Sequence, residues 1–136
     1  MKRELDQKII EEAVAAALAA RTHAYAPYSD FLVGAAVVDT DGGVHVGCNV
    51  ENASYGLTNC AERAAVAAAT VAGKRDLDLC VVVTDGKSAA SPCGACRQVL
   101  HECSPNMLIL CTTPDRNDVW FSLNDLLPNA FGPKSL

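Results

Sequence analysis

Three cysteines and one glutamate stand at spacings that suit metal chemistry. Cys93 and Cys96 lie three residues apart in SPCGACRQV, directly after a proline, and Cys60 and Glu62 lie in NCAER. Each group falls where we expect the first turn of a helix, and the exposed backbone N–H groups there favour thiolate anions. Because thiolates serve redox pairs and metal sites alike, Cys93 and Cys96 alone leave both chemistries open.

The third cysteine favours a metal site. If two crossover helices follow neighbouring parallel strands, they begin at the same edge of the sheet, and Cys60 can then meet Cys93 and Cys96. Three sulfur ligands suit tetrahedral Zn²⁺ and leave the fourth position to water, as in catalytic zinc sites. Glu62 is close enough to act on that water without being a ligand, which is the pattern of the zinc deaminases.

The elements that position these residues follow from hydrophobic periodicity and turn residues. A helical pattern covers 3–22, and a second helix follows the polar loop NVENASYGLTN, with Thr58 or Asn59 as its cap and its end at Gly73. A third helix is expected at 93–103 and a last helical turn at 122–128. Strands are expected at 31–38, 44–48, 77–84, 106–113 and 119–121.

This order, α-β-β-α-β-α-β-β-α, predicts an α/β fold. Two strand-to-helix units after an opening hairpin indicate a five-stranded mixed sheet covered by helices. A length of 136 residues suits a single domain over 1–136. We expect the site near the strand ends where the helices begin.

Composition excludes several classes of function. Lys and Arg number 11 against 16 Asp and Glu, which gives a net charge of −5 and argues against a nucleic-acid groove. No apolar run approaches the roughly 20 residues of a membrane span, and the charged start MKRELDQKIIEE lacks the core of a signal peptide. We therefore expect a cytoplasmic protein, in which seven cysteines do not form a disulfide framework. Three of them lie in or beside apolar runs and are expected to pack as small hydrophobes: Cys48, Cys80 and Cys111.

Longer segments resemble one family. AYAPYSDFLVGAA, GCNVENASYGLTNCAER, SPCGACRQV and LLPNAFGP, within about 24–133, resemble the small homotetrameric cytidine deaminases of pyrimidine salvage. The resemblance implies a three-layer α-β-α fold and one Zn²⁺ per subunit on Cys60, Cys93 and Cys96. It further implies hydrolysis of free cytidine and 2′-deoxycytidine to uridine and 2′-deoxyuridine with release of ammonia, and Glu62 as the residue that carries the protons.

The resemblance also implies how a nucleoside is held. Asn49 and Glu51 would bind the ribose 3′-hydroxyl, which requires an ordered polar loop. Phe31 would stack near the base, and the backbone N–H of Ala61 would contact the carbonyl of the base.

Three further residues receive roles in the same way, and a fourth, Arg97, is a candidate through its position. Tyr55 and Phe131 are similar to residues that complete a neighbouring subunit's pocket, so that activity would require the assembly. Arg63 resembles an arginine that donates to the ligand sulfur atoms and restores the electrophilicity of a zinc site with a net charge of −1. Arg97, beside Cys96, either assists Arg63 or forms an ordinary ion pair.

The residues leave four alternatives open. A structural zinc module would use Cys48 or Cys103 as a fourth ligand and would leave Glu62 idle. A thioredoxin-like domain would use Cys93 and Cys96 as a redox pair and would have no use for the third cysteine. A nucleic-acid editing deaminase would need a basic, aromatic-lined channel. A blasticidin S deaminase would share the zinc motif and the size of the chain.

Overall fold

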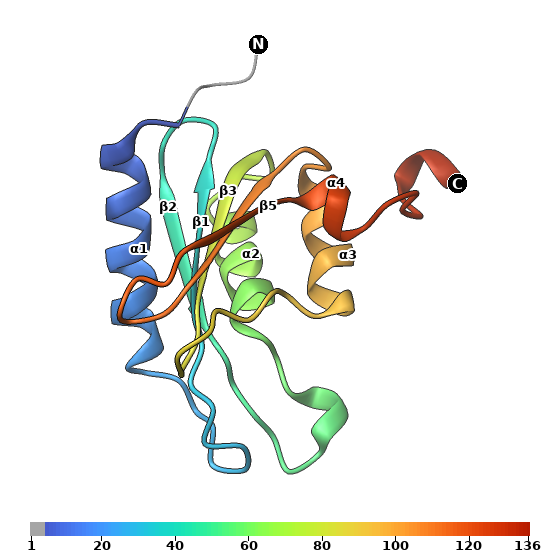
Figure 1. Cartoon of the computed structure of the whole chain (residues 1–136). Coiled ribbons are helices and arrows are strands. Elements are labelled where there is room, and N and C mark those ends of the chain that lie inside the picture. Colours follow the sequence, from blue (N-terminus) through green and yellow to red (C-terminus); the bar gives the residue numbers. More distant parts are fainter. Residues whose placement is uncertain (1–4) are drawn as a thin grey trace.

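A computed structural model describes residues 5–136, so the predicted helical residues 3 and 4 lie outside the described residues. The first helix, α1 (Gln7–Arg21), begins after Asp6, whose side chain accepts a hydrogen bond of 2.9 Å from the N–H of Ile9. The strands form one sheet in the order β2-β1-β3-β4-β5 (Figure 1). Their bounds are β1 (Gly34–Asp39), β2 (Val44–Cys48), β3 (Leu77–Val83), β4 (Leu108–Thr112) and β5 (Val119–Ser122).

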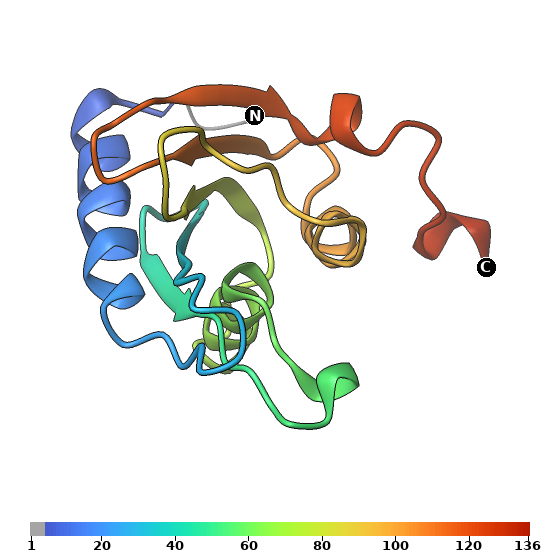
Figure 2. The same cartoon turned by 60° about the horizontal axis from the view of Figure 1, so that its bottom comes forward.

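The remaining elements complete the predicted order. They are the helices α2 (Ala61–Val71), α3 (Gly94–Cys103) and α4 (Leu123–Leu126). The structure adds two short 3₁₀ helices that the sequence did not predict, η1 (Tyr55–Leu57) and η2 (Pro133–Ser135). Helix α1 covers one face of the sheet, and α2 and α3 cover the other (Figure 2). The three-layer α-β-α arrangement and the five-stranded mixed sheet are therefore confirmed.

Both faces of the central strands are buried, which explains their continuous apolar sequences. In β1, Ala35 and Val37 pack in the cluster beneath α2 and α3, whereas Ala36 and Val38 pack in the cluster beneath α1. All residues of β1 and β3 are buried. A strand covered on both sides has no polar face, so its sequence does not alternate.

The two site-bearing helices begin at the same end of the sheet, by a route that differs from the predicted one. We expected α2 and α3 to follow neighbouring parallel strands. Instead, β2 and β3 lie on either side of β1, and each pairs antiparallel with it. Two strands that are antiparallel to a common neighbour run in the same direction, so the helices after β2 and β3 still start at one edge.

Close packing fixes the start of α2 over the sheet. A Cβ atom at Gly47 in β2 would lie 2.4 Å from the carbonyl oxygen of Ala61 and 2.4 Å from the backbone nitrogen of Ala65. Only glycine permits this approach of helix and strand. The residues that begin α2 are thereby held at a set height above the sheet.

The first strand starts later than the sequence predicted. We expected a strand from residue 31, but β1 begins at Gly34. The N–H of Val33 donates to Asn49 Oδ1 over 2.9 Å, and Asn49 Nδ2 donates to the carbonyl oxygen of Phe31 over 2.8 Å. These side-chain bonds replace ladder bonds and hold residues 31–33 beside the pocket described below.

Candidate metal centre and pocket

Three sulfur atoms meet at the starts of α2 and α3. Cys60 and Cys93 are the N-cap residues of these helices, and Cys96 lies in the first turn of α3. Their Sγ atoms all lie within 4.8 Å of one another, and those of Cys93 and Cys96 are 3.5 Å apart. The prediction that Thr58 or Asn59 caps α2 was wrong. Neither N-cap cysteine makes a side-chain capping bond, so its sulfur remains available to a metal.

The donor set fits a zinc ion. Sulfur ligands about 2.3 Å from a tetrahedral zinc lie roughly 3.8 Å from each other, which agrees with this cluster. Within residues 5–136, no fourth His, Cys, Asp or Glu belongs to the group. Cys103, a fourth ligand in the structural zinc alternative, ends the helix that Cys93 begins. Three protein ligands are typical of a catalytic zinc site.

Arg63 supplies positive charge to the cluster. Its Nη2 lies 3.3 Å from Cys60 Sγ and donates also to the carbonyl oxygen of Thr58 over 3.4 Å. A hydrogen bond from the Cys96 thiol, together with Arg63, lowers the pKa of Cys60 to about 5. The proton shared with Cys60 and the burial of Cys96 raise the pKa of Cys96. The site thus favours a thiolate before any metal binds, and zinc binding displaces the remaining thiol protons.

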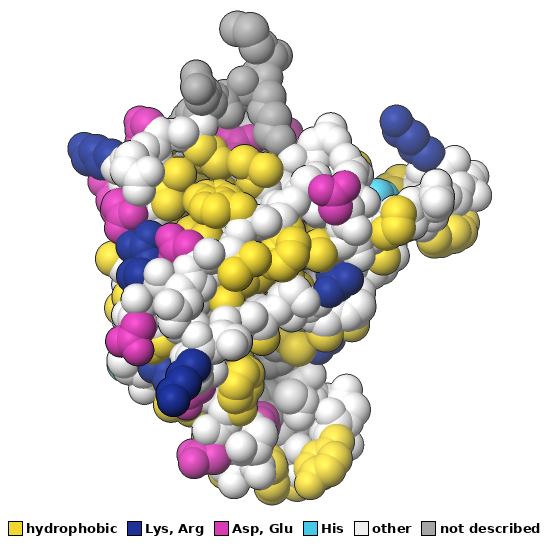
Figure 3. All heavy atoms as spheres, in the orientation of Figure 1, with side chains coloured by type: hydrophobic (Ala, Val, Ile, Leu, Met, Phe, Trp, Pro, Cys, Tyr) yellow, Lys and Arg dark blue, Asp and Glu magenta, His cyan; other side chains and the backbone are white. Residues whose placement is uncertain are grey.

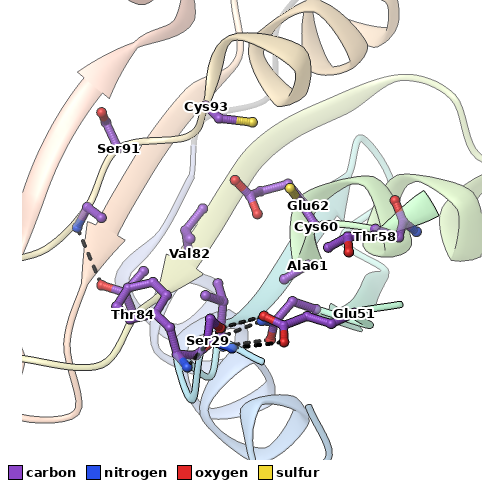
Figure 4. Close-up of a pocket in the computed structure, with 15 residues that line it drawn as sticks. Ser29, Glu51, Thr58, Cys60, Ala61, Glu62, Val82, Thr84, Ser91 and Cys93 are labelled. Carbon is purple, nitrogen blue, oxygen red and sulfur yellow. Dashed lines mark hydrogen bonds between the residues drawn. The ribbon is translucent and has the colours of Figure 1, made fainter. Parts of the chain in front are cut away.

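Glu62 lies beside the sulfur atoms but outside their group. It is in the first turn of α2, and only 5% of the residue is exposed. Figure 4 shows its carboxylate beside Cys60, on the side toward Cys93 and above Val82 of β3. Burial raises the pKa of Glu62, which favours a carboxyl group that can hold a proton and return it.

A pocket of about 260 Å³ opens beside the metal centre (Figure 4). It lies where β2 and β3 end and where β1 and α2 begin, near the strand ends at which we expected the site. Its walls include most of the candidate residues: Phe31, Asn49, Glu51, Cys60, Ala61, Glu62 and Cys93. A ligand in this pocket contacts both the metal-binding sulfur atoms and the polar loop that follows β2.

The polar loop is ordered by its own hydrogen bonds. Glu51 accepts from the backbone N–H groups of Tyr28, over 2.9 Å, and Ser29, over 3.2 Å, and also from the Ser29 hydroxyl. The Ser29 hydrogen bond lowers the pKa of Glu51, so this residue presents a carboxylate at neutral pH. Asn49 uses one lone pair and one N–H on residues 31–33, which leaves one of each for a ligand.

Two candidate residues project away from this pocket. Tyr55 in η1 is 76% exposed and Phe131 in the C-terminal segment is 61% exposed, and neither lines the cavity of its own chain. Figure 3 shows hydrophobic side chains on the projecting η1 loop and along the C-terminal segment. Their implied role, completing the pocket of a neighbouring subunit, involves a second chain and therefore stays a prediction.

The structure adds pocket residues that the sequence reasoning missed. Ser29, Thr84 and Ser91 line the cavity, and Thr84 Oγ1 accepts a hydrogen bond of 3.4 Å from the N–H of Ala90. Two of them could have been identified from the sequence, because Ser29 lies in the segment PYSDF and Ser91 lies beside the cysteine motif. Thr84 gave no signal except its place at the end of a buried strand.

Comparisons with known proteins agree with this geometry. Residues 7–112 match the family described as "Cytidine and deoxycytidylate deaminase zinc-binding region". The chain is 47% identical to a cytidine deaminase of Halalkalibacterium halodurans, over 92% of each chain. It is 51% identical to a cytidine deaminase of Mycobacterium tuberculosis, over 80% of this chain and 79% of the relative.

A solved structure matches in shape as well as in sequence. The cytidine deaminase from Burkholderia pseudomallei superposes with a TM-score of 0.85 at 49% identity, over 89% of this chain and 98% of that one. Separately, no helix among residues 5–136 has both the length and the apolar character needed to cross a membrane.

Proposed function

The chain belongs to the cytidine and deoxycytidylate deaminase family, and we propose that it hydrolyses free cytidine and 2′-deoxycytidine to uridine and 2′-deoxyuridine. Ammonia is the second product. The observation that carries the proposal is the group of three cysteine sulfur atoms, without a fourth protein ligand among residues 5–136, at the wall of a pocket that also contains a buried glutamate.

Each residue at the metal centre has a separate task. Cys60, Cys93 and Cys96 hold one zinc ion per subunit, and a bound zinc ion supplies a water activated for attack at neutral pH. Glu62 would accept one proton from the water molecule that adds to C4 of the cytosine ring. Glu62 would pass this proton to N3, then take the proton of the new hydroxyl group on C4 and pass it to the amine, which would leave as ammonia while the C4 carbonyl forms. Arg63 offsets part of the negative charge of the sulfur ligands.

The pocket residues orient the nucleoside. The Glu51 carboxylate and the free amide positions of Asn49 bind the ribose 3′-hydroxyl, and Ser29 keeps that carboxylate in place. Phe31 stacks near the base, and the backbone N–H of Ala61, at the start of α2, donates to the carbonyl oxygen of the base. Both residues line the cavity, which supports these roles.

We place the active protein in the cytoplasm as a homotetramer, with residues 1–136 as one domain. The exposed side chains of Tyr55 and Phe131 support this assembly, because large apolar groups on projecting segments are typical of subunit contacts. In the tetramer these side chains complete the pockets of neighbouring subunits. The net charge of −5 argues against a nucleic-acid partner.

The direct test is the loss of cytidine ultraviolet absorbance when purified, zinc-loaded protein is added. We expect turnover of cytidine and 2′-deoxycytidine, and its loss after the metal is removed with a chelator. Blasticidin S is assayed beside them under the same conditions. Turnover of blasticidin S alone, or of none of the three substrates by protein that contains one zinc ion per subunit, would refute the proposal.

A further inference from the structure

Arg97 makes three hydrogen bonds that the proposed mechanism does not use. Its Nε donates to the carbonyl oxygen of Pro92 over 2.7 Å, its Nη1 to the carbonyl oxygen of Leu126 over 2.8 Å, and its Nη2 to the Ser91 hydroxyl over 3.0 Å. The sequence left two roles open for this arginine. The observed contacts fit neither role, because all three acceptors are neutral oxygen atoms rather than sulfur atoms or carboxylates.

These contacts join two segments that are far apart in the sequence. Ser91 and Pro92 immediately precede Cys93, the N-cap residue of α3 and a ligand in the proposed zinc site. Leu126 is the last residue of α4 and leads into the C-terminal segment. A single planar guanidinium group therefore fixes the approach to a metal ligand against the C-terminal part of the chain.

The next residue makes a related contact that reaches only the C-terminal segment. Gln98 Nε2 donates to the carbonyl oxygen of Phe131 over 2.8 Å. Gln98 thus anchors the segment that carries Phe131, and its side chain makes no hydrogen bond with Ser91 or Pro92. Both side chains therefore anchor the C-terminal part of the chain, but only Arg97 also holds the residues before Cys93. Substituting each residue in turn distinguishes these two effects.

We infer that Arg97 is a positioning residue that fixes residues 91–93 so that Cys93 keeps its place in the zinc site. The inference rests on the zinc site of the proposed function. Cys93 is exposed and makes no side-chain capping bond, so the backbone before it needs support from elsewhere. Two hydrogen bonds from a cationic donor supply that support, and a third fixes the same guanidinium group to Leu126; charge-assisted bonds are stronger than neutral ones.

The test measures zinc retention, which does not depend on turnover. Zinc-loaded wild-type protein and the Arg97→Ala, Arg97→Lys and Gln98→Ala variants are mixed with excess chelator, and zinc release is followed with a metal-sensitive dye. We expect Arg97→Ala to release zinc about 10- to 100-fold faster, the range typical when a group that supports a metal ligand is removed. Arg97→Lys gives an intermediate rate, and Gln98→Ala keeps the wild-type rate.

A variant destabilised elsewhere separates positioning from general loss of stability. Asp39→Asn removes the charge and replaces Oδ2, which binds His45 Nε2, at the β1–β2 turn, far along the sheet from the three ligand cysteines, and we expect wild-type zinc release from it. In cobalt-loaded protein, the absorption bands should change in Arg97→Ala and stay unchanged in Asp39→Asn. Wild-type release from both Arg97 variants, or equal acceleration in Asp39→Asn or Gln98→Ala, would overturn the inference.

Discussion

Glu62 combines burial with a position beside three sulfur atoms that it does not join as a ligand. We predict that Glu62→Gln keeps the fold and the bound zinc but lowers kcat by about 10²- to 10⁴-fold, because an amide cannot accept and return the proton. Metal analysis and the cytidine absorbance assay on the same sample check this result. Turnover near the wild-type rate in a zinc-loaded variant would contradict the proposed role of Glu62.

Substitution of a metal-binding cysteine should remove the zinc ion that Glu62→Gln keeps. We predict that Cys93→Ala loses zinc during purification, because two remaining sulfur ligands hold the ion far more weakly than three. Its activity then follows its metal content. The informative comparison is with Glu62→Gln, which should keep its zinc but lose most of its activity. A Cys93→Ala protein with one zinc ion per subunit would show that the sulfur of residue 93 is not a ligand.

The chemistry of the metal centre was predictable from the sequence because its residues are few and chemically specific. Three cysteines and a glutamate at fixed spacing allow few other uses, and the structure places the sulfur atoms together. The supporting residues were not predictable in the same way. Ser29 matters through a hydroxyl bonded to Glu51, and Arg97 through bonds to backbone oxygen atoms, and such contacts leave no spacing pattern in the chain.

Among the elements, the β1–β2 hairpin carries a buried charge at its turn. Asp39 accepts hydrogen bonds from the N–H groups of Asp41, over 2.8 Å, and Gly43, over 3.1 Å, and from Nε2 of His45, over 2.7 Å. Burial alone would raise the pKa of Asp39, but the hydrogen bonds from His45, Gly43 and Asp41 outweigh it and hold that pKa below its usual value. The carboxylate form therefore stabilises the hairpin.

Because folding lowers the pKa of Asp39, the contribution of this residue to the free energy of unfolding decreases at low pH. The contribution of Asp39 is fully present above its unfolded pKa of about 3.9 and is lost as the pH falls through the lower folded value. We predict that Asp39→Asn lowers the free energy of unfolding by about 2 kcal/mol at pH 7. Urea unfolding of both proteins, with zinc removed by chelator, should show this difference shrinking below about pH 4. A difference that stays constant down to pH 3 would contradict the assignment.

Element order was predictable, whereas element ends depended on contacts with residues distant in the sequence. Helix, hairpin and buried-strand patterns gave the correct order and a mixed sheet covered by helices, and the family resemblance implied the three layers. The start of β1 at Gly34 depends on the Asn49 side chain, which replaces ladder bonds at residues 31–33. The cap of α2 is Cys60 rather than a typical capping residue, because that position also serves the sulfur cluster.

At the scale of the whole molecule, the apolar side chains of η1 and the C-terminal segment have little cover within the chain. Tyr55 makes an edge-to-face contact with Tyr28, with ring centroids 5.9 Å apart, yet remains largely exposed. Leu57 and Phe131 are also exposed. Within the proposed tetramer, we expect these side chains to be covered by other subunits, so that removing one of them harms a pocket in another subunit.

We predict that Phe131→Ala lowers activity about tenfold or more while zinc content stays at the wild-type level, because in the proposed tetramer this side chain would contact the ligand rather than the metal. Co-expression with Glu62→Gln tests whether the contact crosses between subunits. A pocket in the mixed assembly is intact when Glu62 comes from a Phe131→Ala subunit and Phe131 comes from a Glu62→Gln neighbour. Random assembly from equal amounts makes about a quarter of the pockets intact, so the mixture should exceed both parents and approach about a quarter of the wild-type rate. Light scattering measures the assembly state, and a mixed rate equal to the mean of the two parents would place Phe131 at the pocket of its own chain or at none.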